Sequence, residues 1–284
     1  MPDLDPAIAR RMIDATAYIF DMDGTLVLGD AASGGHKALP GAADLLSTLR
    51  SRYTPFRVFT NGTAKPPSVY AASLRHAGLD VADHEMMTPS TSAAAWFVRK
   101  GIKRVRVLGL DGVQAPLIEA GIEVVGPSEM ASNVEAVYTG WFREFTLPDL
   151  EMACRDVWDG AIVTTASNVP FFAALGGRAI GASFAINAMI RAMTGKQAKV
   201  LGKPSQNALH SGLALMNLPR SAARSTVIVG DDPALEMRMA RVSGALGVAV
   251  TTGLNNAADF LACAPSQQAD VILSGLEPIV KALS

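Results

Sequence analysis

Two aspartates, Asp21 and Asp23, lie two positions apart just after the apolar stretch from Ala17 to Phe20. Residues i and i+2 of an extended segment point the same way, so both carboxylates can face one point beyond a strand end. Gly24 follows and permits a turn that other residues resist. The pair could supply a nucleophile and a proton shuttle for attack on phosphorus, with a hard divalent cation, expected to be Mg²⁺, offsetting the charge repulsion. Read alone, it also fits an exposed acidic turn, the commoner case for so short a motif.

Three further polar segments follow apolar runs later in the chain. Thr60 and Asn61 end one run and could donate hydrogen bonds to a phosphoryl oxygen. Lys203 lies on a loop flanked by glycine and proline and could place a positive charge beside a phosphate. Asp231 and Asp232 end the most strand-like run and could complete a metal site. Each signal alone also fits an ordinary turn or a solvated loop, but their order together is a strong signal.

In this order the segments resemble the four motifs of the haloacid dehalogenase superfamily of aspartate-nucleophile phosphatases. The long stretch between Asn61 and Lys203 resembles the large α/β cap that the 4-nitrophenylphosphatase, nucleotide and pyridoxal phosphate phosphatase branch inserts there. The resemblance spans nearly the whole chain. The matching motifs are Asp21-Met22-Asp23-Gly24-Thr25, Thr60-Asn61-Gly62, Gly202-Lys203-Pro204 and Gly230-Asp231-Asp232.

The resemblance implies a phosphatase that works in two steps. Asp21 would attack phosphorus and form an aspartyl phosphate, while Asp23 would protonate the leaving oxygen and then activate water. Mg²⁺ would be held by the carboxylates of Asp21 and Asp231 and by the backbone carbonyl of Asp23. Lys203 would also act catalytically by neutralising charge. The phosphoryl oxygens would be bound by Thr60, Asn61, Gly62 and Lys203.

Two positions depart from the pattern that this branch usually shows. Its fourth motif carries a second aspartate five residues after the first, whereas this chain has Glu236 there and a further acid, Asp232. The outer shell of the metal site is therefore expected to be Asp232 or Glu236, acting through water or on Lys203. The branch's substrate loop usually reads Ala-Thr-Asn with an acid close behind, which this chain lacks. In its place, substrate contacts from the cap are expected from Ser167, Asn168 and Phe171.

Short apolar runs alternate with helical patterns along the chain, which predicts an α/β fold. The resemblance specifies a three-layer, Rossmann-like parallel sheet core, residues 1–83 and 189–284, with an inserted α/β cap at residues 84–188. Ligands bind outside the carboxyl ends of the strands of such sheets, which is where every motif lies. The expected strands are Ala17–Phe20, Arg57–Thr60, Val105–Leu108, Glu123–Val125, Val134–Tyr138, Ile162–Thr165, Val200–Leu201, Thr226–Val229, Gly247–Val250 and Val271–Leu273.

Composition excludes several other classes of protein. A length of 284 residues with 49% hydrophobic content suits one or two domains with large cores. A net charge of −1 without a Lys/Arg cluster argues against nucleic-acid binding. The longest low-charge run, Ala179 to Ile190, is shorter than the about twenty apolar residues that span a bilayer, and it predicts a buried helix instead. The N-terminal residues do not form a secretory signal, so a cytoplasmic location is expected.

The remaining metal-binding and redox residue types predict no second site. Cys154 and Cys263 are expected to be reduced thiols. The four histidines share no metal-ligand spacing and are expected to be surface or structural residues. They are His36, His76, His84 and His210.

The expected ligand is a small phosphorylated metabolite, and a homodimer formed through the cap is a further expectation. Two other functions stay open. A phosphotransferase or mutase would use the same intermediate but exclude water. A noncatalytic metabolite-binding protein would account for the altered fourth motif and cap loop.

Overall fold

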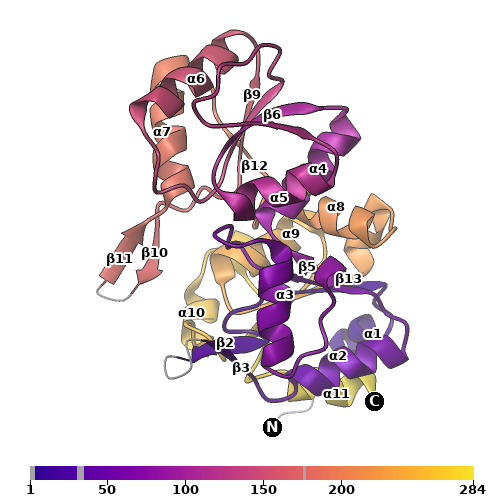
Figure 1. Ribbon diagram of the computed structural model, residues 1–284. Coiled ribbons are helices and arrows are strands. Elements are labelled where there is room, and N and C mark those ends of the chain that lie inside the picture. The colour runs from indigo at the N-terminus through magenta and orange to yellow at the C-terminus, as the bar shows by residue number, and fades with distance from the viewer. Residues whose placement is uncertain (1–3, 31–34, 175–176) are drawn as a thin grey trace. The chain divides into compact units, whose positions relative to one another are not determined.

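The chain divides into two compact units (Figure 1). The computed structural model describes residues 4–30, 35–174 and 177–284. The first unit comprises Met1–Thr60, Ser68–Met87 and Pro204–Ser284, and the second comprises Asn61–Pro67 and Thr88–Lys203. The second unit thus contains most of the stretch expected for the cap, and its role as a cap stays a prediction.

The first unit is built on a six-stranded sheet whose strand pairs are all parallel. Parallel strands are covered on both faces and therefore read as continuous apolar runs, which is why the stretch from Ala17 to Phe20 is buried throughout. In sheet order the strands are β15 (Val271–Leu273), β14 (Leu246–Val250), β13 (Thr226–Gly230), β1 (Ala17–Phe20), β4 (Phe56–Phe59) and β5 (Met86–Met87).

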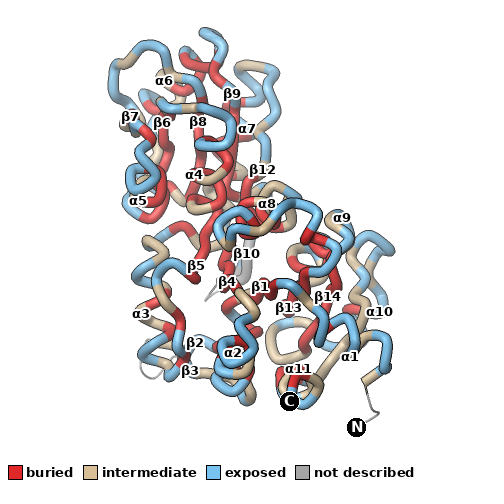
Figure 2. The backbone as a smooth tube through the Cα atoms, turned by 90° about the vertical axis from the view of Figure 1, so that its right-hand side faces the viewer, coloured by how far each residue is buried: buried red, intermediate tan, exposed pale blue. Residues whose placement is uncertain are grey.

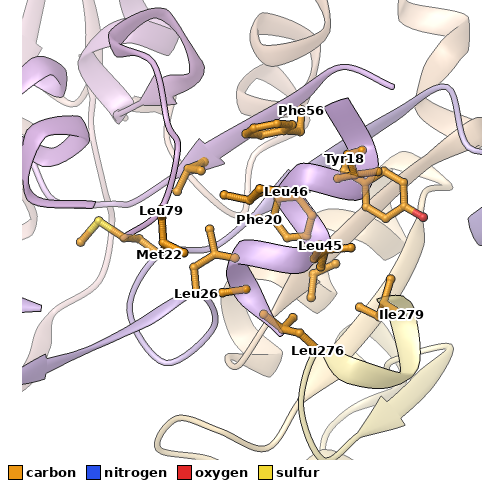
Figure 3. Packing of buried hydrophobic residues seen from close by; sticks show 14 of the residues in the cluster. Tyr18, Phe20, Met22, Leu26, Leu45, Leu46, Phe56, Leu79, Leu276 and Ile279 are labelled. Carbon is orange, nitrogen blue, oxygen red and sulfur yellow. The ribbon is translucent and has the colours of Figure 1, made fainter. Parts of the chain in front are cut away.

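Helices cover both faces of this sheet, and alternate residues of β1 belong to opposite cores. Tyr18 and Phe20 pack with helix residues such as Leu45 and Ile279 (Figure 3), whereas Ile19 packs on the other face with Leu209. The predicted three-layer α/β fold is therefore confirmed. The helices are α1 (Pro6–Ile13), α2 (Ala42–Ser51), α3 (Pro67–His76), α8 (Gln206–Leu215), α9 (Arg238–Ser243), α10 (Ala257–Ala262) and α11 (Glu277–Leu283), with shorter helical turns at Asp83–Glu85, Arg220–Ser225, Pro233–Met237 and Pro265–Gln267.

The second unit repeats the same architecture around a five-stranded parallel sheet. Val107 and Tyr138 pack on one face with Phe97, and Val137 packs on the other with Ile186. Figure 2 shows the buried strands of this sheet between more exposed helices. The strands are, in order, β12 (Lys199–Val200), β9 (Ile162–Thr165), β8 (Ala136–Thr139), β6 (Arg104–Leu108) and β7 (Glu123–Val125), and the helices are α4 (Pro89–Lys100), α5 (Asp111–Glu119), α6 (Leu147–Trp158) and α7 (Ala182–Thr194).

Two antiparallel hairpins were not predicted from the sequence. One pairs β2 (Val27–Asp30) with β3 (Gly35–Ala38) in the first unit. The other pairs β10 (Phe171–Ala174) with β11 (Gly177–Ile180) in the second. The predicted helix from Ala179 was therefore wrong at its start. The chain leaves β11 at Gly181, where a side chain would overlap the backbone oxygen of Val169.

The structure bears on two predictions, that the chain has no membrane-spanning segment and that Cys154 and Cys263 are reduced thiols. In the described part of the chain, no helix combines the length and the apolar character that crossing a membrane requires. Cys154 and Cys263 are both free thiols, the first buried and the second partly exposed.

Candidate active site

The loop after β1 carries Asp21 and Asp23 on the solvent side, while Met22 between them is buried in the core. The backbone of Asp21 extends the sheet by one residue, because its N–H donates to the carbonyl of Val229 at 2.9 Å. Gly24 then adopts φ +83°, a conformation that favours glycine. The side chains of this loop therefore emerge at the carboxyl end of a central strand.

Asp231 follows β13 and lies directly against this loop. A side chain at Gly24 would overlap the carboxylate of Asp231, and so would one at Gly253. The carboxylate fits only because both neighbours are glycines. Its Oδ2 accepts a hydrogen bond from the Leu254 N–H at 3.3 Å, and the Asn255 amide donates to the Asp231 carbonyl at 2.9 Å. The first and fourth motifs thus meet within the first unit.

The loop after β14 is part of this arrangement and was missed by the sequence analysis. The Thr252 hydroxyl donates to the carbonyl of Gly24 at 2.6 Å, so this loop holds the first motif as well as Asp231. A signal was present, since the polar run 251–256 directly follows a predicted strand that ends at Val250. Loops at the carboxyl end of one parallel sheet are expected to converge.

The two acids expected in the outer shell have different positions. Asp232 begins the π-helical turn Pro233–Met237, and its Oδ1 accepts from the N–H groups of Ala234 at 2.7 Å and Leu235 at 3.2 Å. Glu236 is buried and folds back over Gly230, where a side chain would overlap it. Its Oε2 accepts from the Asp232 N–H at 3.2 Å. Asp232 therefore acts as a helix cap, and Glu236 holds the backbone beside Asp231.

The second and third motifs supply a tightly bonded pair in the second unit. The Asn61 amide donates to the Lys203 carbonyl at 3.1 Å and accepts from the Lys203 N–H at 3.0 Å. Lys203 is 1% exposed. Gly202 allows this approach, because a side chain there would overlap the carbonyl of Ala166. The Asn61 side chain thus fixes the lysine loop. Gly62 is partly exposed, and Thr60, which follows β4 in the first unit, is buried.

Of the predicted substrate residues, Ser167 and Asn168 lie between β9 and β10, and Phe171 begins β10. The Ser167 hydroxyl accepts from the Val169 N–H at 3.2 Å and so shapes a turn, while Asn168 is exposed. Phe171 is 45% exposed, and the guanidinium of Arg178 lies 4.3 Å from its ring centroid. The loop and the adjoining β10–β11 hairpin therefore present an amide, an aromatic face and a cation to solvent.

The residues of the first unit fit a magnesium ion in donor type. Within the described ranges, no group of three or more His, Cys, Asp or Glu side chains is placed to hold a metal ion. The predicted set needs only two such side chains, Asp21 and Asp231, because its third ligand is the backbone carbonyl of Asp23. All three donors are oxygen, as hard cations require. The packing of the Asp231 carboxylate against Gly24 is the observation that supports this fit.

Comparisons with known families agree with these motifs. The model described as haloacid dehalogenase-like hydrolase matches residues 18–123, which contain the first two motifs. A second model, described as HAD-hydrolase-like, matches residues 200–278, which contain the last two. The two matches together cover more than half of the chain.

Named relatives match most of the sequence. The dihydroxyacetone phosphatase of Corynebacterium glutamicum is 26% identical over 247 residues, covering 86% of this chain and 84% of the relative. The 4-nitrophenylphosphatase of Schizosaccharomyces pombe is 26% identical over 279 residues, covering 90% of each. A crystal structure of a glycerol phosphate phosphatase from Mycobacterium tuberculosis in complex with magnesium matches with a TM-score of 0.78 and 24% identity, covering 96% of this chain and 78% of that chain. That protein has also been solved with calcium. This structural likeness establishes a shared fold.

Proposed function

The chain belongs to the haloacid dehalogenase-like hydrolases, and on that premise we propose that it is a Mg²⁺-dependent phosphatase of small phosphorylated metabolites. The observation that carries the proposal is the packing of the Asp231 carboxylate against Gly24, directly after Asp21 and Asp23, which the absence of side chains at Gly24 and Gly253 permits. This packing brings Asp231 to the first motif at the carboxyl ends of two central strands, and a phosphoryl group there needs both a nucleophile and a cation. The dihydroxyacetone and 4-nitrophenyl phosphatase relatives support the choice of substrate class.

The proposed reaction has two displacements at phosphorus. A carboxylate oxygen of Asp21 attacks in line, the bond from phosphorus to the leaving oxygen breaks, and Asp23 gives that oxygen a proton. Asp23 then takes a proton from water, whose oxygen attacks the aspartyl phosphate and releases Asp21 and inorganic phosphate. The Lys203 ammonium offsets negative charge on the phosphoryl oxygens. Mg²⁺, held by Asp21, Asp231 and the Asp23 carbonyl, would neutralise charge in both displacements.

Turnover of 4-nitrophenyl phosphate tests this function. We expect release of 4-nitrophenol and phosphate with Mg²⁺, and loss of both on adding a chelator in excess of the metal. A chain that binds phosphorylated metabolites without turning them over would be a noncatalytic binding protein instead. Phosphate transfer to an added alcohol in preference to water would identify a phosphotransferase. A screen of phosphorylated metabolites would then name the substrate.

Substitutions of Asp231 and Glu236 test which of the two side chains binds the metal directly. Asp231→Ala removes a carboxylate ligand and should sharply raise the Mg²⁺ concentration that gives half-maximal activity. Glu236→Ala removes the acceptor of the Asp232 N–H but no proposed metal ligand, so we expect a smaller change, roughly 10–100-fold in metal affinity or activity. The measurement is a Mg²⁺ titration of 4-nitrophenyl phosphate hydrolysis.

Two variants control this comparison. Glu236→Gln keeps an oxygen acceptor and should stay closer to the parent than Glu236→Ala. Asp232→Asn keeps the helix cap, because asparagine caps as well as aspartate. An Asp231→Ala protein with the same metal requirement as the parent would remove Asp231 from the ligand set.

We also propose that Ser167, Asn168 and Phe171 contact the leaving group of the substrate and so determine which substrates are preferred. The aromatic face of Phe171 and the cation of Arg178 are exposed, and small-molecule sites commonly combine apolar surface with a few polar groups. Phe171→Ala should reorder the preferences among large phosphorylated metabolites but leave acetyl phosphate turnover nearly unchanged. Trp158→Ala, an exposed aromatic on α6, is the matched control. Parallel losses on large and small substrates would assign the loop a structural role.

A further inference from the structure

The unpredicted β2–β3 hairpin brings a histidine to the first motif. The hairpin begins directly after the motif, and Asp23 forms an isolated bridge with Val27 at its base. The pairing places Gly29 opposite His36 and so returns His36 towards the loop. There the Nε2 atom of His36 lies 3.3 Å from Oδ1 of Asp23. The other ring nitrogen, Nδ1, lies 2.7 Å from the hydroxyl oxygen of Ser73 on α3.

These two contacts define the orientation of the imidazole ring. A carboxylate oxygen that carries no proton can only accept a hydrogen bond, so the 3.3 Å approach of Nε2 to Oδ1 of Asp23 favours a proton on Nε2. In the neutral ring Nδ1 is then an acceptor, and the Ser73 hydroxyl donates to it. The Ser73 hydroxyl can donate or accept, so Asp23 is the partner that favours the proton on Nε2, and Ser73 holds the ring in its orientation.

The exposed fractions show that the His36 side chain is held more firmly than that of Asp23. The His36 side chain is 21% exposed, while that of Asp23 is 56% exposed. A solvated carboxylate samples several rotamers, and a hydrogen bond from a fixed donor narrows that choice. Ser73 is on a helix whose Ala71 and Leu74 pack in the core of the first unit. The chain from Ser73 through His36 to Asp23 thus connects a packed helix to an exposed acid.

We propose that His36, oriented by Ser73, is a positioning residue for the proton transfers of Asp23. The inference rests on the proposed function, because that function makes Asp23 the acid and base. Asp23 must reach the leaving oxygen in one step and the attacking water in the next. Small displacements of a catalytic group are costly, so a donor that holds its carboxylate should increase the rate of both steps.

The test compares two substrates with different needs for a proton donor. Alkyl phosphates such as glycerol 3-phosphate need protonation of the leaving oxygen, whereas 4-nitrophenolate leaves readily as an anion. His36→Ala should lower kcat for the alkyl ester by roughly 10–100-fold with little change in KM, as loss of a supporting hydrogen bond typically does. The first turnover of 4-nitrophenyl phosphate should stay near the parent rate and appear as a burst, because only the later water attack still needs Asp23.

Matched variants distinguish positioning from folding. His36→Gln can present an N–H near the position of Nε2 and should recover part of the activity on the alkyl ester. The compared ratio is that of kcat for the alkyl ester to the first-turnover rate for 4-nitrophenyl phosphate. Ser73→Ala should lower this ratio, as His36→Ala does, but by less. His76→Ala, at an exposed position on α3 where the ring bonds to the Ala72 carbonyl, should leave the ratio unchanged. Thermal unfolding of each variant measures any loss of folded protein.

The outcomes separate this inference from the proposed function. Equal losses on both esters, in proportion to the loss of folded protein, would show that His36 only secures the hairpin and would overturn the positioning role while leaving the phosphatase intact. No recovery in His36→Gln, with the protein folded, would also count against it. A parent chain that hydrolyses neither ester would overturn both proposals.

Discussion

Asp21→Asn is expected to abolish nearly all hydrolysis of phosphate esters. The substitution keeps the size of the side chain and removes the attacking charge, and deletion of a nucleophile elsewhere costs about a million-fold in kcat. The backbone bond from the Asp21 N–H to the Val229 carbonyl is unaffected by the change, so the fold should persist. The measurement is kcat for 4-nitrophenyl phosphate at saturating Mg²⁺, with thermal unfolding to confirm a folded protein.

A second aspartate of the same unit controls for the loss of one negative charge. Asp44 is an exposed residue in the first turn of α2, and Asp44→Asn should hydrolyse the ester at the parent rate. Rapid acid quenching of the parent should also trap phosphate on the protein, and Asp21→Asn should trap none. Activity of Asp21→Asn within about tenfold of the parent would contradict covalent catalysis by this residue, since an amide is a far poorer nucleophile.

The sheets could be predicted because burial on both faces leaves a simple pattern. The strands Ile162–Thr165 and Val271–Leu273 were predicted with the bounds that the structure shows. The strand Ala17–Phe20 was also predicted with its observed bounds. These elements are long or apolar enough for periodicity to identify them. The order of motifs at their ends then predicted which loops would carry the candidate site.

Contacts between distant segments could not be read from such patterns. The packing of Asp231 against Gly24 and Gly253 depends on three loops meeting, and in the sequence each is only an acid or a glycine after a strand. The hairpin strands of His36 are short and carry glycine, so they lack an alternating apolar face. His36 was expected to be a surface or structural residue because the four histidines share no metal-ligand spacing, and its contact with Asp23 becomes visible only in the fold.

The side-chain roles of the polar motif residues were harder to predict than their positions. Asn61 was expected to bind a phosphoryl oxygen, which stays a prediction, and in the structure its amide bonds both backbone groups of Lys203. Asp232 was one of two candidates for the outer shell, and its carboxylate caps a helical turn. Polar side chains that can bond a ligand can also bond nearby backbone, and sequence alone does not rank the two.

Asp23→Asn separates the proton shuttle from the metal site. The substitution keeps the nucleophile and the backbone carbonyl of residue 23, which is the atom proposed to bind Mg²⁺. It also keeps an oxygen that can accept from the His36 Nε2–H. The capacity to give and take a proton is lost together with the charge of the carboxylate, and the loss of proton transfer should cost roughly 10²–10⁴ in kcat.

A Mg²⁺ titration of the activity of Asp23→Asn tests whether the carboxylate of Asp23 transfers protons or binds the metal. In Asp23→Asn the Mg²⁺ concentration for half-maximal activity should match the parent while kcat falls, the opposite of the pattern expected for Asp231→Ala. The loss should be greater for glycerol 3-phosphate than for the first turnover of 4-nitrophenyl phosphate, because an alkoxide needs the proton that Asp23 supplies. A variant as active as the parent on both esters would show that another group transfers the proton. A raised metal requirement would instead place the Asp23 carboxylate itself among the ligands.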